Sequence, residues 1–185
     1  MIRTFIGVHI DPKTVQRISE FLVQVKPLLP GIRWVPSRNF HFTLKFLGDI
    51  EETKIDPVAQ ALELRLGPFP RFTINAKSLG VFPTAKRPRV LWVGLEGKGL
   101  RELVSAIETA LEPLGFTPEQ RGFLPHLTVG RWRQFTAPGK TLARELGKWQ
   151  SLEFGESKVE AVIFFRSELK PEGAFYHPLK VVALA

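Results

Sequence analysis

Most hydrophobic residues of this chain fall in short segments rich in β-branched and aromatic side chains, a composition typical of strands. Proline, glycine and asparagine separate these segments, as expected of turns. The segments lie at residues 4–10, 32–35, 41–47, 71–82, 89–95, 151–154, 158–166 and 174–182, and another begins at residue 126. We therefore expect a protein that contains many strands.

Four other segments carry apolar residues three or four positions apart, which predicts helices with one buried face. The first begins at Pro12, with Asp11 as its N-cap, and ends before Pro30 and Gly31. The other helices are expected at residues 55–66, 97–114 and 142–149. Helices and strands are thus interleaved along the chain, which favours an α+β fold.

A pattern of histidine, an apolar residue, threonine and an apolar residue occurs twice in the chain. Residues 41–44 read His-Phe-Thr-Leu and residues 126–129 read His-Leu-Thr-Val, 85 positions later. The two long helices predicted to start near residues 12 and 97 are separated by the same interval. Equal spacing of several features indicates an internal duplication. We expect a single domain, residues 1–185, built from two pseudo-symmetric lobes.

Each copy of the pattern presents an imidazole beside a hydroxyl, because residues two apart in a strand point to the same face. His41 is paired in this way with Thr43, and His126 with Thr128. Two imidazoles on opposite sides of a cleft can activate water and protonate a leaving oxygen without a metal. The alternation also places Lys45 on the face of His41, although its side chain could equally extend to solvent. The threonines could instead be simple strand formers.

The composition narrows the range of functions. The chain has 26 lysines and arginines against 18 acidic residues, a formal net charge of +8. This balance favours a polyanionic partner such as nucleic acid, although a generic basic surface explains the charge equally well. The absence of cysteine excludes disulfides and thiolate metal sites. Because neither motif contains a carboxylate, we expect no metal and no other cofactor.

No run of residues approaches the roughly 20 apolar residues of a membrane span, and the N-terminal segment lacks the apolar stretch of a signal peptide. We therefore expect a cytoplasmic protein that does not act at a membrane. No obligate protein partner is evident, and we expect a monomer. Among the remaining candidates, His9 is expected to be structural or exposed, and His177 to be structural, with a contact to phosphate or nucleotide as the alternative. The four tryptophans are expected mostly in the core, and Trp132, between two arginines, is the best candidate among them for an exposed aromatic or for stacking on a base.

Several stretches of the chain resemble the 2H phosphoesterases, and within them the LigT-like RNA 2',3'-cyclic phosphodiesterases, also called 2'-5' RNA ligases. The stretches are Arg-Trp-Val-Pro at residues 33–36, the segment 39–48 around the first motif, residues 87–94, the segment 125–131 around the second motif, and residues 167–169 with 173–176. The resemblance implies two lobes around a central cleft. Each lobe would be a mainly antiparallel sheet with helices on its outer face.

The resemblance also implies a reaction, in which RNA or a nucleotide ending in a 2',3'-cyclic phosphate is hydrolysed to a 2'-phosphate. His41 would be the proton donor and His126 the proton acceptor. Thr43, Thr128 and Arg131 would bind the phosphate. Strand alternation places Arg131 on the face opposite His126, so this role requires the strand to end or bulge near residue 130.

Two alternatives remain open from the sequence. The same site run backwards would be a 2'-5' RNA ligase, since an enzyme catalyses both directions of its reaction. A non-catalytic RNA-binding module would use the basic surface and tolerate the loss of both histidines.

Overall fold

The computed structural model describes residues 1–119, 122–133 and 139–185. The helices are α1 (Pro12–Val25), α2 (Ile55–Leu66), α3 (Leu100–Leu111) and α4 (Gly139–Trp149). The strands are β1 (Ile2–His9), β2 (Ile32–Trp34), β3 (His41–Ile50), β4 (Phe72–Phe82), β5 (Val90–Glu96), β6 (His126–Trp132), β7 (Glu153–Val159), β8 (Ala161–Lys170) and β9 (Gly173–Ala183).

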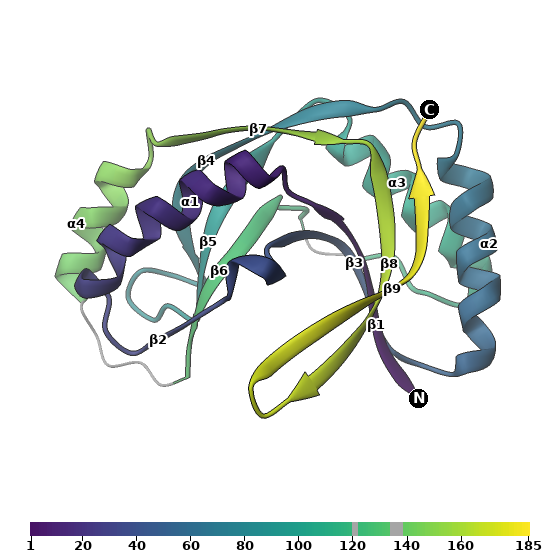
Figure 1. Cartoon of the computed structure of the whole chain (residues 1–185), viewed down its shortest axis with the longest axis horizontal. Helices are drawn as coiled ribbons and strands as arrows, with labels where there is room; N and C mark the ends of the chain where they lie inside the picture. Colours follow the sequence, from purple (N-terminus) through teal and green to yellow (C-terminus); the bar gives the residue numbers. More distant parts are fainter. Residues whose placement is uncertain (120–121, 134–138) are drawn as a thin grey trace.

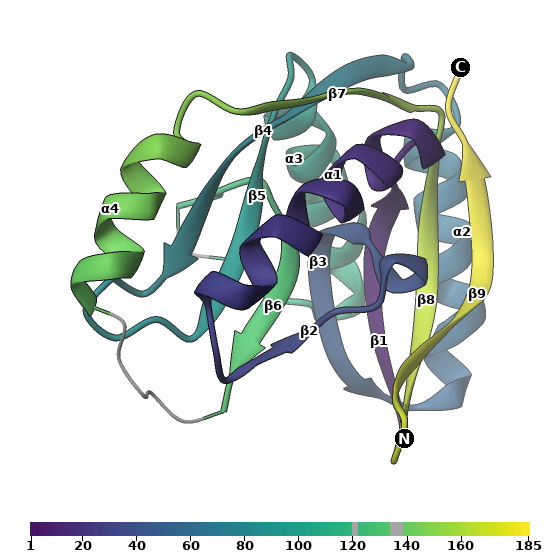
Figure 2. The ribbon, with the colours of Figure 1, turned by 60° about the vertical axis from the view of Figure 1, so that its left-hand side comes forward.

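The strands form one curled sheet in the order β7-β4-β5-β6-β3-β1-β8-β9, with β2 added beside β6. All the strand pairings of the described residues are antiparallel. The ladder at the centre of the sheet is very short, because β3 and β6 pair only through Phe42 and Leu127. This point divides the sheet into lobe A (β3, β1, β8 and β9) and lobe B (β6, β5, β4, β7 and β2) (Figures 1 and 2).

The helices lie on the outer sides of the two lobes, and two of them are exchanged between the lobes (Figure 1). Helix α1 follows β1 of lobe A but packs against β7 of lobe B. Helix α3 follows β5 of lobe B but packs against α2 and β3 of lobe A. Because separating the lobes would expose these buried helix faces to water, the exchange holds the lobes together. The predicted α+β fold with two lobes is confirmed.

Helix α1 shows how the local sequence determines these elements. The Asp11 carboxylate accepts a hydrogen bond from the backbone N–H of Lys13 at 2.8 Å, and Pro12 occupies the first turn, as predicted. Ile18, Leu22 and Val25 are buried along one stripe of the helix. They pack into the main core that the two lobes share.

Some element boundaries differ from those that the pattern predicts. Two strands are present, as predicted at residues 151–154 and 158–166, but those bounds are wrong, because β7 spans Glu153–Val159 and β8 spans Ala161–Lys170. Gly155 lies inside β7 with φ of 110°, beside the point where the register with β4 shifts. The glycine therefore permits a bulge instead of ending the strand. In addition, β3 continues to Ile50, and α3 ends at Leu111 before a 3₁₀ turn.

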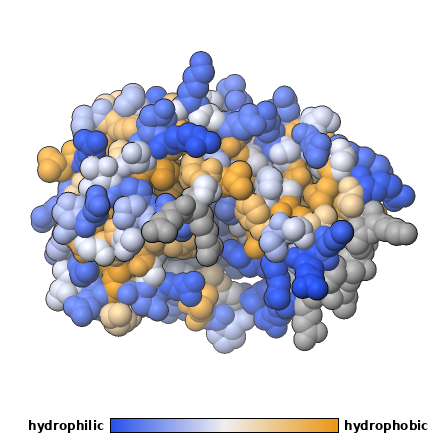
Figure 3. All heavy atoms as spheres, turned by 180° about the vertical axis from the view of Figure 1, so that it is seen from behind, coloured by the Kyte–Doolittle hydropathy of each residue, from blue (hydrophilic) through white to orange (hydrophobic). Residues whose placement is uncertain are grey.

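The outer surface is mixed in character. On the face opposite to that of Figure 1, hydrophilic and apolar side chains are interspersed (Figure 3). In the described parts of the chain, no helix is both long enough and apolar enough to span a membrane.

Candidate active site

The two motif histidines open the two central strands of the sheet. His41 is the first residue of β3 and His126 the first residue of β6. These strands are antiparallel and pair at the residue after each histidine. Extending this register by one residue in each direction places His41 opposite Thr128 and Thr43 opposite His126. The four motif side chains are thus brought to one face of the sheet, called here the site face.

Both imidazoles are oriented by the same kind of hydrogen bond. Nδ1 of His41 lies 2.7 Å from the backbone carbonyl of Asn39, and Nδ1 of His126 lies 2.8 Å from that of Leu124. Since a carbonyl only accepts, Nδ1 carries the hydrogen in each ring. Nε2 is then the nitrogen left for chemistry. It accepts a proton when the ring is neutral and donates one when the ring is charged.

An aromatic wall surrounds His41 on lobe A. The rings of Phe5 and Tyr176 each lie 4.8 Å from the imidazole, centroid to centroid, and Phe165 lies at 6.3 Å. Together with Ile163, these side chains form a small apolar cluster separate from the main core. Burial lowers the pKa of His41 below its ordinary value of 6.5, and the hydrogen bond to the backbone opposes this effect.

His126 has a comparable wall on lobe B. The ring of Phe82 lies edge-on at 5.0 Å and that of Trp92 at 6.5 Å. Burial again lowers the pKa of the histidine below 6.5, against the effect of the Leu124 carbonyl. A Cβ on Gly80 would lie 2.1 Å from the Trp92 ring, so glycine is needed there for the indole to fit. The sequence analysis did not identify these walls as part of the site.

A bulge in β6 brings Arg131 to the site face. Gly130 pairs with Leu91, whereas the next pair along the ladder joins Thr128 to Trp92, so Val129 is an extra residue. The extra residue shifts the alternation by one position. The charge of Arg131 accordingly lowers the pKa of both motif histidines. The bulge that a phosphate-binding role for Arg131 requires is therefore present.

A matching bulge in β3 turns Lys45 away from the site face. In the ladder with β1, Thr43 and Lys45 are paired while Leu44 is extra. The placement of Lys45 on the face of His41 is therefore wrong. The residue is only 7% exposed, forms an ion pair with Glu108, and donates to the Thr117 carbonyl at 2.9 Å. The extra residues Leu44 and Val129 are 85 positions apart, like the histidines.

The other candidates lie as follows. His9 pairs directly with His41 in the ladder of β1 and β3, and its charge lowers the pKa of His41. Trp132 is 4% exposed and belongs to the core, so the expectation of base stacking is wrong. His177 is exposed and lies 3.1 Å from the Glu168 carboxylate, a surface contact.

The described ranges contain no group of three or more His, Cys, Asp or Glu side chains that could hold a metal ion.

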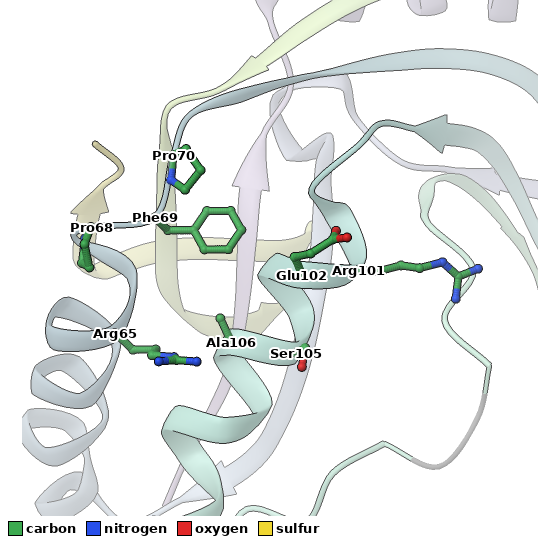
Figure 4. A pocket seen from close by; sticks show the side chains of 8 residues that line it. All are labelled: Arg65, Pro68, Phe69, Pro70, Arg101, Glu102, Ser105 and Ala106. Carbon is green, nitrogen blue, oxygen red and sulfur yellow. The ribbon is translucent and has the colours of Figure 1, made fainter.

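Among the described residues, the structure contains two pockets near the surface. One pocket, of about 690 Å³, is lined by Ser37, Arg38 and His9 among others, and His9 is the ladder partner of His41. A second, of about 610 Å³, lies between α2 and α3 (Figure 4). It is lined by Arg65, Pro68, Phe69, Pro70, Arg101, Glu102, Ser105 and Ala106.

Comparisons with known proteins agree with this architecture. The family model of the LigT-like phosphoesterases matches the chain twice, over residues 8–92 and 93–176. An RNA 2',3'-cyclic phosphodiesterase of Methanocaldococcus jannaschii is 33% identical over 179 residues, which cover 97% of this chain and 99% of the relative.

Two solved structures have the same fold. A crystal structure of a Thermus thermophilus protein superposes with a TM-score of 0.84 at 25% identity, and covers 99% of this chain and 98% of its own. Escherichia coli LigT, crystallised with 3'-AMP, superposes with a TM-score of 0.78 at 23% identity, over 100% and 98% of the two chains.

Proposed function

Because this chain belongs to the LigT-like phosphoesterase family, we propose that it hydrolyses 2',3'-cyclic phosphates at the ends of RNA or nucleotides. The product would be a 2'-phosphate. The observation that carries the proposal is the register of β3 and β6, which brings two histidines and two threonines to one face. The name of the M. jannaschii relative supports the substrate class.

The reaction needs a base on one side of phosphorus and an acid on the other. Neutral His126 accepts a proton from water at Nε2 while the water oxygen attacks phosphorus. His41, protonated at Nε2, donates its proton to the 3'-oxygen as the P–O3' bond breaks. The product keeps the phosphate on O2' and gains a 3'-hydroxyl. The two imidazoles then return to their starting charges by exchanging protons with solvent.

His41 can act as the acid only when its imidazole is protonated, and this depends on its burial and on the charges beside it. Burial lowers its pKa in the free protein, which disfavours the imidazolium. An anionic phosphate bound beside the ring favours the charged form and opposes this effect. Substrate binding would therefore help to place the proton where the leaving oxygen needs it.

The remaining site residues would bind the phosphate. In the pentacoordinate transition state, negative charge grows on the non-bridging oxygens, so donors aimed at them lower the barrier. The hydroxyls of Thr43 and Thr128 lie on the site face by the same register. Arg131 supplies a guanidinium, which forms strong charge-assisted hydrogen bonds to phosphate.

The test is hydrolysis of a 2',3'-cyclic mononucleotide, followed by phosphorus NMR. His41→Ala and His126→Ala should each lower kcat by about 10²–10⁴-fold, the contribution of one general acid or base. His177→Ala, which removes an exposed histidine, is the matched control and should retain activity. Near-normal hydrolysis by either motif variant would exclude the two-histidine mechanism. A 3'-phosphate product would show that the substrate binds in the opposite orientation.

We also propose that residues 1–185 form one domain of two duplicated lobes, which acts as a monomer in the cytoplasm. The exchange of α1 and α3 between the lobes supports a single folding unit. Light scattering should give the mass of one chain, and urea unfolding should show one transition with the same midpoint by fluorescence and circular dichroism. Two separate transitions would mean that the lobes fold independently.

A further inference from the structure

Two arginines lie directly opposite each other beside the proposed phosphate site. Arg33 of β2 pairs with Arg131 of β6. The flanking pairs join Ile32 to Trp132 and Trp34 to Gly130, on the buried face of the ladder. Arg33 therefore shares the site face with Arg131. Like charges directly opposite each other destabilise a sheet unless an anion lies between or beside them.

The described residues provide no such anion. No carboxylate among them forms an ion pair with either arginine. On the nearby hairpin of β8 and β9, the Glu168 carboxylate is held by Lys170 at 3.4 Å and by His177 at 3.1 Å. The positive charge of the arginine pair is thus available to a ligand.

The positive charge continues from the arginine pair to the tip of this hairpin. A Cβ on Gly173 would lie 3.8 Å from Nη2 of Arg33, so the guanidinium reaches the turn of the hairpin. Arg38 and Lys170 lie over the ring of Phe175, at 5.8 Å and 5.1 Å. The next residue, Tyr176, points to the other face of β9, where it contacts His41. Three cations therefore gather around the tip of this hairpin, beside the arginine pair.

We infer that Arg33 binds the phosphate on the 5'-oxygen of the ribose that carries the cyclic phosphate, while Arg131 faces the cyclic phosphate itself. This inference rests on the proposed function. A cyclic phosphate occupies both the 2'- and the 3'-oxygen, so the next phosphate can only be on the 5'-oxygen. Guanidinium suits this position because it forms paired, charge-assisted hydrogen bonds to phosphate oxygens. The preferred substrate then carries a second phosphate.

The experiment compares four substrates by kcat/KM. They are a bare 2',3'-cyclic nucleotide, the same nucleotide with a 5'-phosphate, a dinucleotide ending in the cyclic phosphate, and that dinucleotide with an uncharged methylphosphonate linkage. The wild type should prefer the second and third substrates by about tenfold over the first, the strength of one charge-assisted contact. The methylphosphonate dinucleotide should behave like the bare nucleotide.

Arg33→Gln should remove this preference, mainly through KM, so that kcat/KM falls about tenfold more for the charged dinucleotide than for the bare nucleotide. Arg33→Lys should restore part of it. Arg65→Gln is the matched control, because it removes one positive charge on α2, a helix on the outer side of lobe A (Figures 1 and 4). The wild-type salt dependence of log kcat/KM should be steeper by about 0.7 for the charged dinucleotide, and Arg33→Gln should abolish the difference.

The outcomes separate the possibilities. A gain with both phosphorylated substrates identifies a phosphate of either kind as the ligand, and a gain with the charged dinucleotide alone identifies the diester. If the methylphosphonate dinucleotide keeps the gain, the second nucleoside is recognised and the inference is wrong. An equal loss on all substrates in Arg33→Gln also overturns it. If the wild type hydrolyses none of the substrates, the proposed function fails instead.

Discussion

Breaking the ion pair between Lys45 and Glu108 tests whether Lys45 lies on the buried face of β3, opposite to the site face. The Lys45 side chain is 6% exposed and that of Glu108 15% exposed. Lys45 also donates to the Thr117 carbonyl, and the Glu108 carboxylate accepts from the backbone N–H of Glu119. Lys45→Met removes the ammonium but keeps most of the apolar stem. The variant therefore leaves a largely buried carboxylate without its cation.

The expected cost follows from this environment. Removing one partner of a buried ion pair costs about 3–5 kcal/mol, because the remaining charge stays desolvated. The residual exposure of Glu108 and its hydrogen bond to a backbone N–H place the loss near the lower end, at about 3 kcal/mol. For a chain of 185 residues, 1 kcal/mol shifts Tm by about 2–4 °C. The variant should therefore melt about 6–12 °C below the wild type.

The assay is a double-mutant cycle with Glu108→Gln, measured by urea unfolding, together with steady-state hydrolysis. The double variant should regain about 2 kcal/mol relative to Lys45→Met, because glutamine carries no charge and can still accept a hydrogen bond. Well below the melting temperature, kcat should stay within about twofold of the wild type, since Lys45 points away from the histidines. Unchanged stability with a kcat reduced tenfold or more would refute the assignment. So would additive losses in the cycle.

Four further predictions concern the site. Because burial lowers the pKa of His41 and His126, the bell-shaped profile of kcat/KM should peak on the acid side of 6.5, and a peak above about 7 would contradict this. Stability should also fall as the pH drops through 6.5, where the unfolded chain binds protons first; His41→Gln should reduce this slope in pH-dependent urea titrations. Hydrolysis should survive excess chelator, whereas loss restored by a divalent ion would require a metal. Gly80→Ala, whose Cβ would overlap the Trp92 ring, should cost about 1–3 kcal/mol and lower kcat. Wild-type melting and turnover would show that the indole can move freely.

The features that the sequence predicted are those set by neighbours along the chain. The cap of α1 needs only Asp11 and Pro12, and its buried stripe needs only the spacing of apolar residues. The partnership of His41 with Thr43, and of His126 with Thr128, needs only the alternation of a strand. The interval of 85 residues between the motifs indicated the duplication, which the two matches of the family model also show.

Some predictions failed because the alternation of side chains along a strand was applied across a β-bulge, where it no longer holds. Alternation placed Lys45 on the site face and Arg131 on the opposite face, and the bulges after Thr43 and Thr128 reverse both. A bulge is decided by how two strands align across the ladder, and by which side chains must fit between them. Trp132 has a basic sequence neighbourhood, yet its ring lies in the core, because the bulge in β6 turns it to the face opposite Arg131.

The aromatic side chains around the two histidines could not be predicted from the sequence either, because they come from different strands. Phe5, Tyr176 and His41 come from three different strands and meet only because β1 lies between β3 and β8. The opposed pair of Arg33 and Arg131 likewise depends on β2 pairing with β6. The sequence by itself thus determined the chemical groups and their local direction. Only long-range strand pairing decided which of them share one face, because that pairing brings together residues that are distant along the chain.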